Sequence, residues 1–309
     1  MLLWALVSTL AAFEPDPLQA GKPWVLRGHT DVVVAMAFSP DGQSMATIAR
    51  DKTLRLWDLS TGGVRHTVTF PHEQLNAVGF SGDGRWVAVG DLALQVSVVE
   101  VATGKVHRTL AHPDAAGEVA LDREGALLAV AGVGDTGAVY ELASGRRRFE
   151  FRGRTAQFSD DGKLLLTART SGLVTVLDSK SGKIVRSIDV TPDKPLACMR
   201  GDASLVATWA PAGLDVKVWK GELKAPPQLL KGPVADLGRP QARVTGVALS
   251  PDGKRALVGG GDGLVRLWEL DGPRVERVFD VERSAGVAWA RAGGWIAVID
   301  RSLVKLWKP

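Results

Sequence analysis

The sequence predicts an all-β protein, a seven-bladed β-propeller in which four-stranded antiparallel sheets stand in a ring. One observation is a turn-like segment, most often of the form Ser-x-Asp-Gly, that recurs seven times along the 309 residues. Another is a β-strand that ends in a large residue 17 to 19 positions after each turn begins. A repeat of about 40 to 45 residues is typical of propellers, in which one repeat forms one blade. The turns begin at Ser39, Ser81, Asp122, Ser159, Arg200, Ser250 and Ala290, and the large residues are Trp57, Val99, Tyr140, Leu177, Trp219, Trp268 and Trp307.

Residues 1–22 precede the first repeat and are interpreted as an apolar leader and linker. The segment Met1–Phe13 is too short for a membrane span, which needs about 20 apolar residues, but it has the length of a signal-peptide core. No Lys or Arg precedes this apolar run, and the best cleavage pattern, Thr9-Leu10-Ala11, leaves only a short core before it. Export to the periplasm or the cell exterior is the favoured interpretation, and the alternatives are a cytoplasmic protein with a frayed N-terminus and a misassigned start codon.

The first complete repeat shows how each blade is built from four strands, A to D. Between strands A and B, Asp41-Gly42 predicts a tight hairpin in which we expect both residues to take a positive φ. Between strands C and D, a glycine stands five residues after the large residue, where a left-handed turn favours glycine. These glycines are Gly62, Gly104, Gly145 and Gly182. The expected strands of the first repeat are Val32–Phe38, Ser44–Ala49, Thr53–Trp57 and Val64–Phe70.

Strand C repeats a finer pattern, in which an apolar residue, a cation, an apolar residue and a Trp follow one another. The pattern reads Leu54-Arg55-Leu56-Trp57 in the first repeat and returns at Val216–Trp219, Val265–Trp268 and Val304–Trp307. Period-two alternation indicates a β-strand, and it puts the cation on the same face as the tryptophan. We expect the aliphatic part of the cation to cover the indole ring while its charged group reaches solvent.

The two ends of the propeller are predicted to meet in one blade. The last repeat stops after strand C, at Trp307–Pro309, and so lacks a strand D. Trp24–Arg27 stands before Gly28-His29 in the place that strand D holds before the second repeat. Residues 23–27 are therefore expected to complete the seventh blade, which would remove the exposed sheet edges that promote aggregation. The propeller is thus predicted as a single domain, residues 23–309, and as a monomer.

Several residues of the first repeat carry a family resemblance. Gly28-His29 opens the repeat, Asp51 follows strand B, and Trp57-Asp58 ends strand C, a pattern that resembles the WD-repeat family of propellers. The resemblance implies a hydrogen-bonded tetrad of a histidine, a hydroxyl, an aspartate and the strand-C tryptophan. The tetrad corresponds here to His29, Thr47, Asp51 and Trp57. The resemblance covers residues 23–309, most strongly in the first and sixth repeats, while His72 and His112 keep the histidine position in the second and third.

Composition excludes several classes of partner and chemistry. The net charge is +4, and the cations do not cluster, apart from five arginines between positions 146 and 154. The same segment includes the alternating Phe149 and Phe151, which indicates a solvated strand edge, so no nucleic-acid partner is expected. Cys198 is the only cysteine, which excludes an intrachain disulfide and a cysteine-ligated zinc site.

The segment Gly132–Gly137 matches the dinucleotide fingerprint G-x-G-x-x-G, but a β-strand follows it, so it is interpreted as a turn.

The leading functional hypothesis is a non-enzymatic scaffold for a protein or peptide partner. The repeat accounts for all five histidines, and no sequence motif assigns a catalytic, metal-binding or cofactor-binding residue. The WD-repeat resemblance implies binding across the face that the D-to-A and B-to-C loops form around the channel. Trp209 is expected to serve there as an exposed anchor, and the loop 231–243 is either a second binding segment or disordered decoration. The candidate binding residues are Arg50, Asp91, Asp135, Arg169, Trp209, Asp262 and Arg301.

Two alternative functions are weighed beside the scaffold. The second to fourth repeats, for example Val174–Lys183, are similar to repeats of lactonase-type and quinoprotein-type propellers, which are enzymes. Such an enzyme needs a convergent acid, base or metal cluster at the mouth of the channel. The other alternative is an exported structural protein that has no specific ligand.

Overall fold

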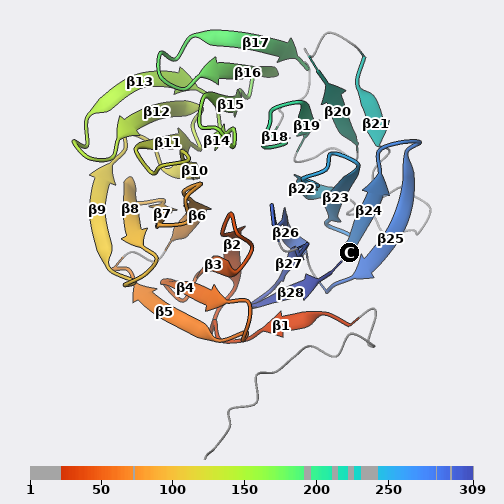
Figure 1. Ribbon diagram of the computed structural model, residues 1–309, viewed down its shortest axis with the longest axis horizontal. Coiled ribbons are helices and arrows are strands. Elements are labelled where there is room, and N and C mark those ends of the chain that lie inside the picture. Colours follow the sequence, from red (N-terminus) through yellow and green to blue (C-terminus); the bar gives the residue numbers. More distant parts are fainter. Residues whose placement is uncertain are drawn as a thin grey trace, which may run out of the picture.

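The computed structural model describes a ring of β-sheets around a central channel (Figure 1). The described residues are 22–71, 74–190, 196–210, 215–221, 226–230, 243–282, 284–292 and 294–308. They form seven four-stranded sheets, in which all neighbouring strands are antiparallel. The prediction of a seven-bladed, all-β propeller is therefore confirmed. The expected leader up to residue 21, the histidine position 72 and the loop residues 231–242 lie outside the described residues.

Each of the first three blades takes four consecutive strands of the chain. Blade 1 contains β2 (Val33–Phe38), β3 (Ser44–Ala49), β4 (Thr53–Asp58) and β5 (Val64–Thr69). Blade 2 contains β6 (Leu75–Phe80), β7 (Trp86–Asp91), β8 (Gln95–Glu100) and β9 (Val106–Ala111). Blade 3 contains β10 (Ala116–Leu121), β11 (Leu127–Gly132), β12 (Thr136–Glu141) and β13 (Arg147–Arg152).

Blades 4 to 6 follow the same plan. Blade 4 contains β14 (Gln157–Phe158), β15 (Leu164–Ala168), β16 (Leu173–Asp178) and β17 (Ile184–Asp189). Blade 5 contains β18 (Leu196–Met199), β19 (Leu205–Trp209), β20 (Val216–Lys220) and β21 (Gln228–Leu230). Blade 6 contains β22 (Val244–Leu249), β23 (Arg255–Gly260), β24 (Leu264–Glu269) and β25 (Arg274–Asp280). In each blade the first strand lies nearest the channel and the fourth at the rim (Figure 1).

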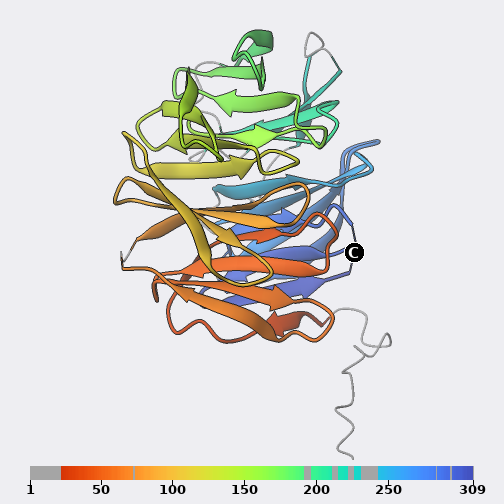
Figure 2. The same cartoon turned by 60° about the vertical axis from the view of Figure 1, so that its left-hand side comes forward.

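Blade 7 joins the two ends of the propeller. It consists of β26 (Ser284–Trp289), β27 (Ile296–Asp300), β28 (Leu303–Trp307) and, at its outer edge, β1 (Trp24–Leu26). Strand β1 runs antiparallel to β28, with Leu26 opposite Val304. Figure 2 shows the red first strand against the blue strands of the last blade. The predicted ring closure by the N-terminal strand is therefore present.

The A-to-B turns use the aspartate differently from the prediction. Gly42 has a φ of 68°, and its N–H donates to the carbonyl of Ser39 at 2.9 Å. Asp41 is not among the residues with positive φ, so that part of the prediction was wrong. The Asp41 carboxylate instead accepts hydrogen bonds from the Ser39 hydroxyl at 2.5 Å and from the Gln43 N–H at 2.9 Å. The aspartate thus closes the turn through its side chain, and only the glycine needs a left-handed backbone.

The C-to-D glycines have a second role besides their turn. Gly62, Gly104, Gly145 and Gly182 have φ values between 67° and 75°, as predicted. A Cβ atom on Gly62 would collide with the ring of Trp24, and one on Gly104 would collide with the ring of His66. In both cases the colliding ring belongs to strand D of the preceding blade. A glycine here lets each outer strand pack closely onto the next blade.

The hydrophobic core is divided among the seven interfaces between blades. Each of seven buried clusters draws side chains from two neighbouring sheets. The cluster between blades 7 and 1, for example, contains Leu26, Met45, Trp57 and Leu306, each at most 2% exposed. Because every sheet is covered on both faces, most residues of the second and third strands of a blade are buried, as in β3 and β11.

Candidate peptide-binding face

The D-to-A and B-to-C loops lie at the same end of the propeller, because backbone hydrogen bonds join them within each blade. The Arg50 N–H donates to the Val32 carbonyl at 2.9 Å, and the Phe70 N–H donates to the Lys52 carbonyl at 2.9 Å. Blade 2 repeats the first bond, from the Leu92 N–H to the Gln74 carbonyl at 3.0 Å. We refer to this end of the propeller as the loop face. Its shape is thus tied to the strands that carry it.

The tetrad of blade 1 anchors the loops of this face. Trp57 Nε1 donates to Thr47 Oγ1 at 2.8 Å, and Thr47 Oγ1 lies 2.7 Å from His29 Nε2. His29 Nδ1 lies 2.9 Å from Asp51 Oδ2, which also accepts from the N–H of Thr30 at 3.0 Å. With the ring proton on Nδ1, the chain of donors runs from Trp57 through Thr47 to His29, and from His29 to Asp51. The network therefore links the core of the blade to both loops.

The charge states of the tetrad follow from burial and from these bonds. Burial lowers the pKa of His29 below its ordinary value, although the bond to Asp51 opposes this effect. Burial alone would raise the pKa of Asp51, but hydrogen bonds from Thr53 and His29 hold it below its ordinary value. A neutral imidazole facing a carboxylate is consistent with a structural tetrad.

Other blades tie the same region with different chemistry. In blade 3, His112 Nδ1 lies 2.9 Å from the hydroxyl of Tyr140. In blade 6, the guanidinium of Arg266 contacts the Asp262 carboxylate at 2.8 Å, and both side chains are at most 10% exposed. The expectation that the strand-C cation reaches solvent was therefore wrong for Arg266, because the buried carboxylate compensates its charge inside the protein. In blade 7, Lys305 contacts Asp300 at 2.6 Å.

The structure places the seven candidate binding residues in three classes of environment. Arg50 and Arg301 are exposed, Asp135, Arg169 and Asp262 are half-buried, although the Asp262 side chain is only 4% exposed, and Asp91 and Trp209 are buried. The Asp91 carboxylate accepts from the N–H groups of Ala93 and Gln95 at 2.9 Å, so it caps its own turn. Arg301 lies 3.0 Å from Glu282. The Asp135 carboxylate accepts from the N–H of Thr170 at 3.1 Å and thus joins the loops of blades 3 and 4.

Trp209 is not available as an exposed anchor. Its side chain is 8% exposed and packs in the core between blades 5 and 6, with Leu230 and Val244. The residue is the last of β19 and pairs with Leu196 and Val216 on its two sides. The ring therefore belongs to the interface between blades and does not reach the surface that a partner would contact.

Sequence reasoning missed four exposed apolar residues on the loop face, one or two in each of blades 1 to 3. Val32, Leu92, Leu94 and Val133 are 38 to 45% exposed, and they lie in the loops of blades 1, 2 and 3. We call these four residues the apolar loop patch. Their signal in the sequence is the presence of large apolar residues at turn positions, where polar residues and glycine are the rule. Large exposed apolar patches mark interaction sites in monomeric soluble proteins.

The backbone of Leu94 adds weight to the apolar loop patch. The residue before strand C has a positive φ in five blades, and it is a glycine in two of them, Gly172 and Gly263. Leu94 takes the same conformation with a φ of 66°. A non-glycine residue in this region costs about 1 to 2 kcal/mol, and such strain is concentrated at functional sites.

A cavity of about 610 Å³ lies beside the apolar loop patch, between blades 1 and 2. Its lining includes Leu92 of the patch together with Arg50, Lys52, Asp31 and Gln74. Of the seven candidate binding residues, only Arg50 lines this cavity. The site thus combines an apolar rim with charged and amide groups.

The channel wall carries a carboxyl group that sequence reasoning also missed. Glu118, on β10, is half-buried and lines the cavity at the channel mouth, and it accepts a hydrogen bond from the N–H of Ala156 at 3.2 Å. Burial raises the pKa of Glu118 to about 8, so the carboxyl group is protonated at neutral pH. Burial raises the pKa of the neighbouring Cys198 thiol to about 12. Within the described ranges, no three His, Cys, Asp or Glu residues stand close enough together to hold a metal ion.

Comparison with known proteins bears on the family and the fold. A family model described as WD domain, G-beta repeat, matches residues 22–58 and 232–269. Autophagy-related protein 16 of Arabidopsis thaliana is 30% identical over 185 residues, which cover 56% of this chain and 36% of that protein. Apoptotic protease-activating factor 1 of Rattus norvegicus is 24% identical over 314 residues, which cover 87% of this chain and 24% of that protein. The chain thus spans roughly a third or less of the length of these two relatives.

One solved structure is similar to this protein over nearly the whole ring. The β-propeller domain of Cps50 (Swd1) from Myceliophteria thermophila matches with a TM-score of 0.78 at 14% sequence identity, and the match covers 93% of this chain and 99% of that chain. In the part of the chain that the structure describes, no helix has the length and apolar character of a membrane span. The two matched repeats and the seven-bladed ring identify the protein as a WD-repeat β-propeller.

Proposed function

We propose that the protein is a non-enzymatic scaffold that binds a peptide segment of a partner protein on the loop face of blades 1 to 3. The observation that carries the proposal is the apolar loop patch beside a cavity of about 610 Å³. Four exposed apolar side chains in adjacent blades leave unfavourable contacts with water that a partner would remove. The name of the relative apoptotic protease-activating factor 1 describes an action on another protein, which fits a scaffold role.

The chemistry of the site indicates the kind of peptide. Leu92 and Leu94 offer apolar contacts, and Arg50 stands beside Leu92 in the lining of the cavity. An extended peptide with two or three large apolar side chains and one acidic residue would satisfy both features. The acidic residue would pair with Arg50, which sets orientation more than affinity, while burial of the apolar groups supplies most of the affinity.

Selection from a library of random peptides, followed by affinity measurement, tests this function. We expect the selected peptides to share large apolar residues and an acidic residue. The decisive variant is Leu94→Asn, because asparagine tolerates a left-handed backbone and the fold should therefore keep its stability. We expect Kd for the selected peptides to rise about tenfold or more, as for loss of one interface anchor.

The chain offers a matched control for this substitution. Val106, at the start of the outer strand β9 of the same blade, is 46% exposed, as much as Leu94 at 45%. Val106→Ser removes a similar exposed apolar group far from the loops, and we expect it to leave Kd unchanged. Wild-type affinity in the Leu94→Asn variant would overturn the proposal, as would a library that yields no apolar peptide above background.

A further inference from the structure

The mouth of the channel opposite the loop face is built from one repeated position. This position is the second residue of each A-to-B turn, and all seven copies line one of two adjoining cavities at this mouth. Four copies are small or rigid, namely Pro40, Gly82, Gly201 and Pro251. The other three are charged, namely Arg123 in blade 3, Asp160 in blade 4 and Arg291 in blade 7. The repeated position therefore contributes two cations and one anion to the mouth, and the second cavity is also lined by Glu118 and by the ion pair of Arg200 and Asp202.

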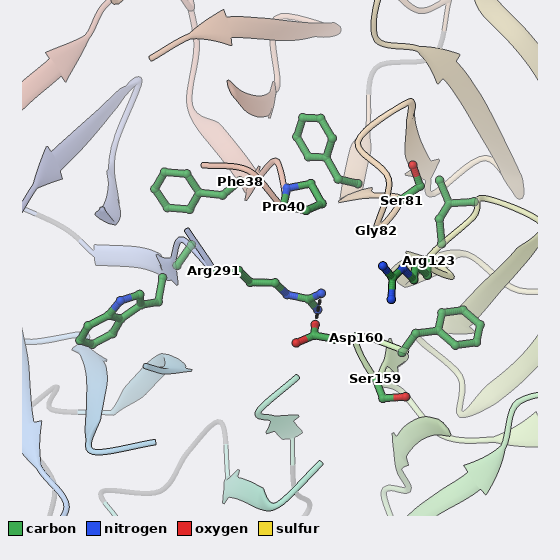
Figure 3. Close-up of a pocket in the computed structure, with 13 residues that line it drawn as sticks. Phe38, Pro40, Ser81, Gly82, Arg123, Ser159, Asp160 and Arg291 are labelled. Atoms are coloured by element: carbon green, nitrogen blue, oxygen red, sulfur yellow. Dashed lines mark ion pairs between the residues drawn. The ribbon is translucent and has the colours of Figure 1, made fainter. Parts of the chain in front are cut away.

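The side chains of Arg123, Asp160 and Arg291 face one another across the opening (Figure 3). The guanidinium of Arg291 reaches from blade 7 to the carboxylate of Asp160 in blade 4 and forms an ion pair with it. The guanidinium of Arg123 lies beside the same space (Figure 3), and no ion pair or hydrogen bond joins it to another side chain of the described residues. One positive charge at the mouth is thus left uncompensated.

Contacts between neighbouring turns hold the charged residues in place. The Gly82 N–H donates to the Asp122 carbonyl at 3.1 Å, and the Asp160 N–H donates to the Gly201 carbonyl at 2.7 Å. A Cβ atom on Gly82 would collide with the backbone of Arg123, and one on Gly201 would collide with the Asp160 carboxylate. The turns of adjacent blades therefore interlock. Such preorganised groups bind a ligand with a smaller loss of conformational entropy.

The wall behind the charges is apolar. The cavity that contains Arg123 has a volume of about 190 Å³, and its lining includes Phe38, Phe80 and Phe158. Since water occupies about 30 Å³ per molecule and a cavity of about 150 Å³ accepts benzene, this space suits one small ring or one short side chain. The combination of aromatic walls and two guanidinium groups selects an anion that carries an apolar body.

We propose that this mouth binds a carboxylate carried on a small apolar group. The carboxylate lies between Arg123 and Arg291, and the apolar group contacts the phenylalanine wall. Asp160 competes with the ligand for Arg291 and repels it. The site is at the opposite end of the channel from the apolar loop patch, so it is independent of the peptide site proposed above. The carboxylate belongs either to a free aromatic acid or to the C-terminal residue of a peptide.

Titration with 4-fluorobenzoate, followed by ¹⁹F NMR on the purified chain, tests the site. We expect binding in the millimolar range for a ligand of about ten heavy atoms. The variants Arg123→Gln and Arg291→Gln should each raise Kd about tenfold, since each removes a charged hydrogen-bond donor. Asp160→Asn should lower Kd several-fold, because it removes the competing carboxylate. The neutral probe 4-fluorobenzamide should bind weakly to all of these proteins.

A matched control separates local contacts from net charge. Arg85 is an exposed arginine in the turn of blade 2, which neighbours the turn that carries Arg123. Arg85→Gln changes the net charge by the same amount as Arg123→Gln. We expect Arg85→Gln to bind 4-fluorobenzoate as the wild type does. Tighter binding of N-acetylphenylalanine than of 4-fluorobenzoate would assign the ligand to a peptide C-terminus, and the reverse order would assign it to a free acid. Absence of binding, equal affinity in all variants, or weaker binding by Asp160→Asn would overturn the proposal.

Discussion

Deletion of residues 1–28 removes β1 and is expected to open the ring, whereas deletion of residues 1–20 leaves β1 in place. Strand β1 is the outer strand of blade 7, and it pairs with β28 at three positions. Its loss exposes the edge of β28 and uncovers the core between blades 7 and 1. Both truncated proteins lack residues 1–20, so they differ only in the segment 21–28 that contains β1.

The structure gives the size of the expected effect. Leu26 is 2% exposed, and burial of a leucine contributes about 2 to 3 kcal/mol. Trp24 stacks on Trp295 with ring centroids 5.7 Å apart and covers Gly62 of blade 1, which adds about 1 to 2 kcal/mol for a half-buried ring. Backbone hydrogen bonds to β28 add about 1 kcal/mol each. The sum, about 5 to 8 kcal/mol, is comparable to the whole stability of a typical domain.

Thermal unfolding followed by circular dichroism measures this effect. At about 2 °C per kcal/mol for a chain of this size, deletion of residues 1–28 should lower Tm by about 10 to 16 °C or yield insoluble protein. Deletion of residues 1–20 should leave Tm unchanged. Leu26→Ala in the full chain should lower stability by about 2 to 5 kcal/mol. Equal melting temperatures of the two truncated proteins would refute the argument that β1 closes the ring.

Further substitutions test the channel wall and the interior of the blades. Because the pKa of Glu118 is raised from 4.5 to about 8, the folded state holds this proton more tightly, and stability should fall as pH rises through that window. Glu118→Gln should therefore flatten the dependence of Tm on pH. Parallel Tm profiles of the wild type and Glu118→Gln would contradict the raised pKa of Glu118. Thr47→Val removes the acceptor of the buried Trp57 N–H and should cost about 1 to 3 kcal/mol in urea unfolding, with a smaller loss counting against the tetrad as an anchor. Arg266→Met removes the cation that faces the buried Asp262 carboxylate and should cost about 3 kcal/mol. Adding Asp262→Asn should recover part of that loss, and an additive double variant would show that the two side chains are not coupled.

The fold could be predicted from the sequence because its determinants are local and repeated. Strands β2 to β5 lie within one residue of their expected bounds, since period-two alternation and turn residues act over a few positions. The conformation of Asp41 could not be predicted from Asp-Gly alone, because that pair fits two kinds of hairpin. Ser39, which stands before the pair and bonds to Asp41, decides between them.

The candidate site was harder to predict than the fold. Alternation along a strand tells which residues share a face, but in a propeller both faces of an inner strand are buried. The position of Trp209 at the end of β19 therefore carried no information about its exposure, and its ring proved to be core. Leu92 and Leu94 could have been found, because apolar residues between Asp91 and strand β8 contradict turn chemistry. The approach of Arg291 to Asp160 depends on the closed ring, which brings blades 4 and 7 face to face across the channel.

The loss of the tetrad in most blades does not loosen the loops, because several chemistries perform the same task. Blade 1 joins His29 and Asp51, blade 3 joins His112 and Tyr140, and blade 6 joins Arg266 and Asp262. In addition to these side-chain contacts, a backbone hydrogen bond joins the B-to-C loop to the D-to-A loop in blades 1, 2, 3 and 6. Since the main chain already fixes the position of the loops, their side chains are released from a structural role. Large apolar residues such as Leu94 can then occupy turn positions, and the loop face gains a binding surface without loss of the ring.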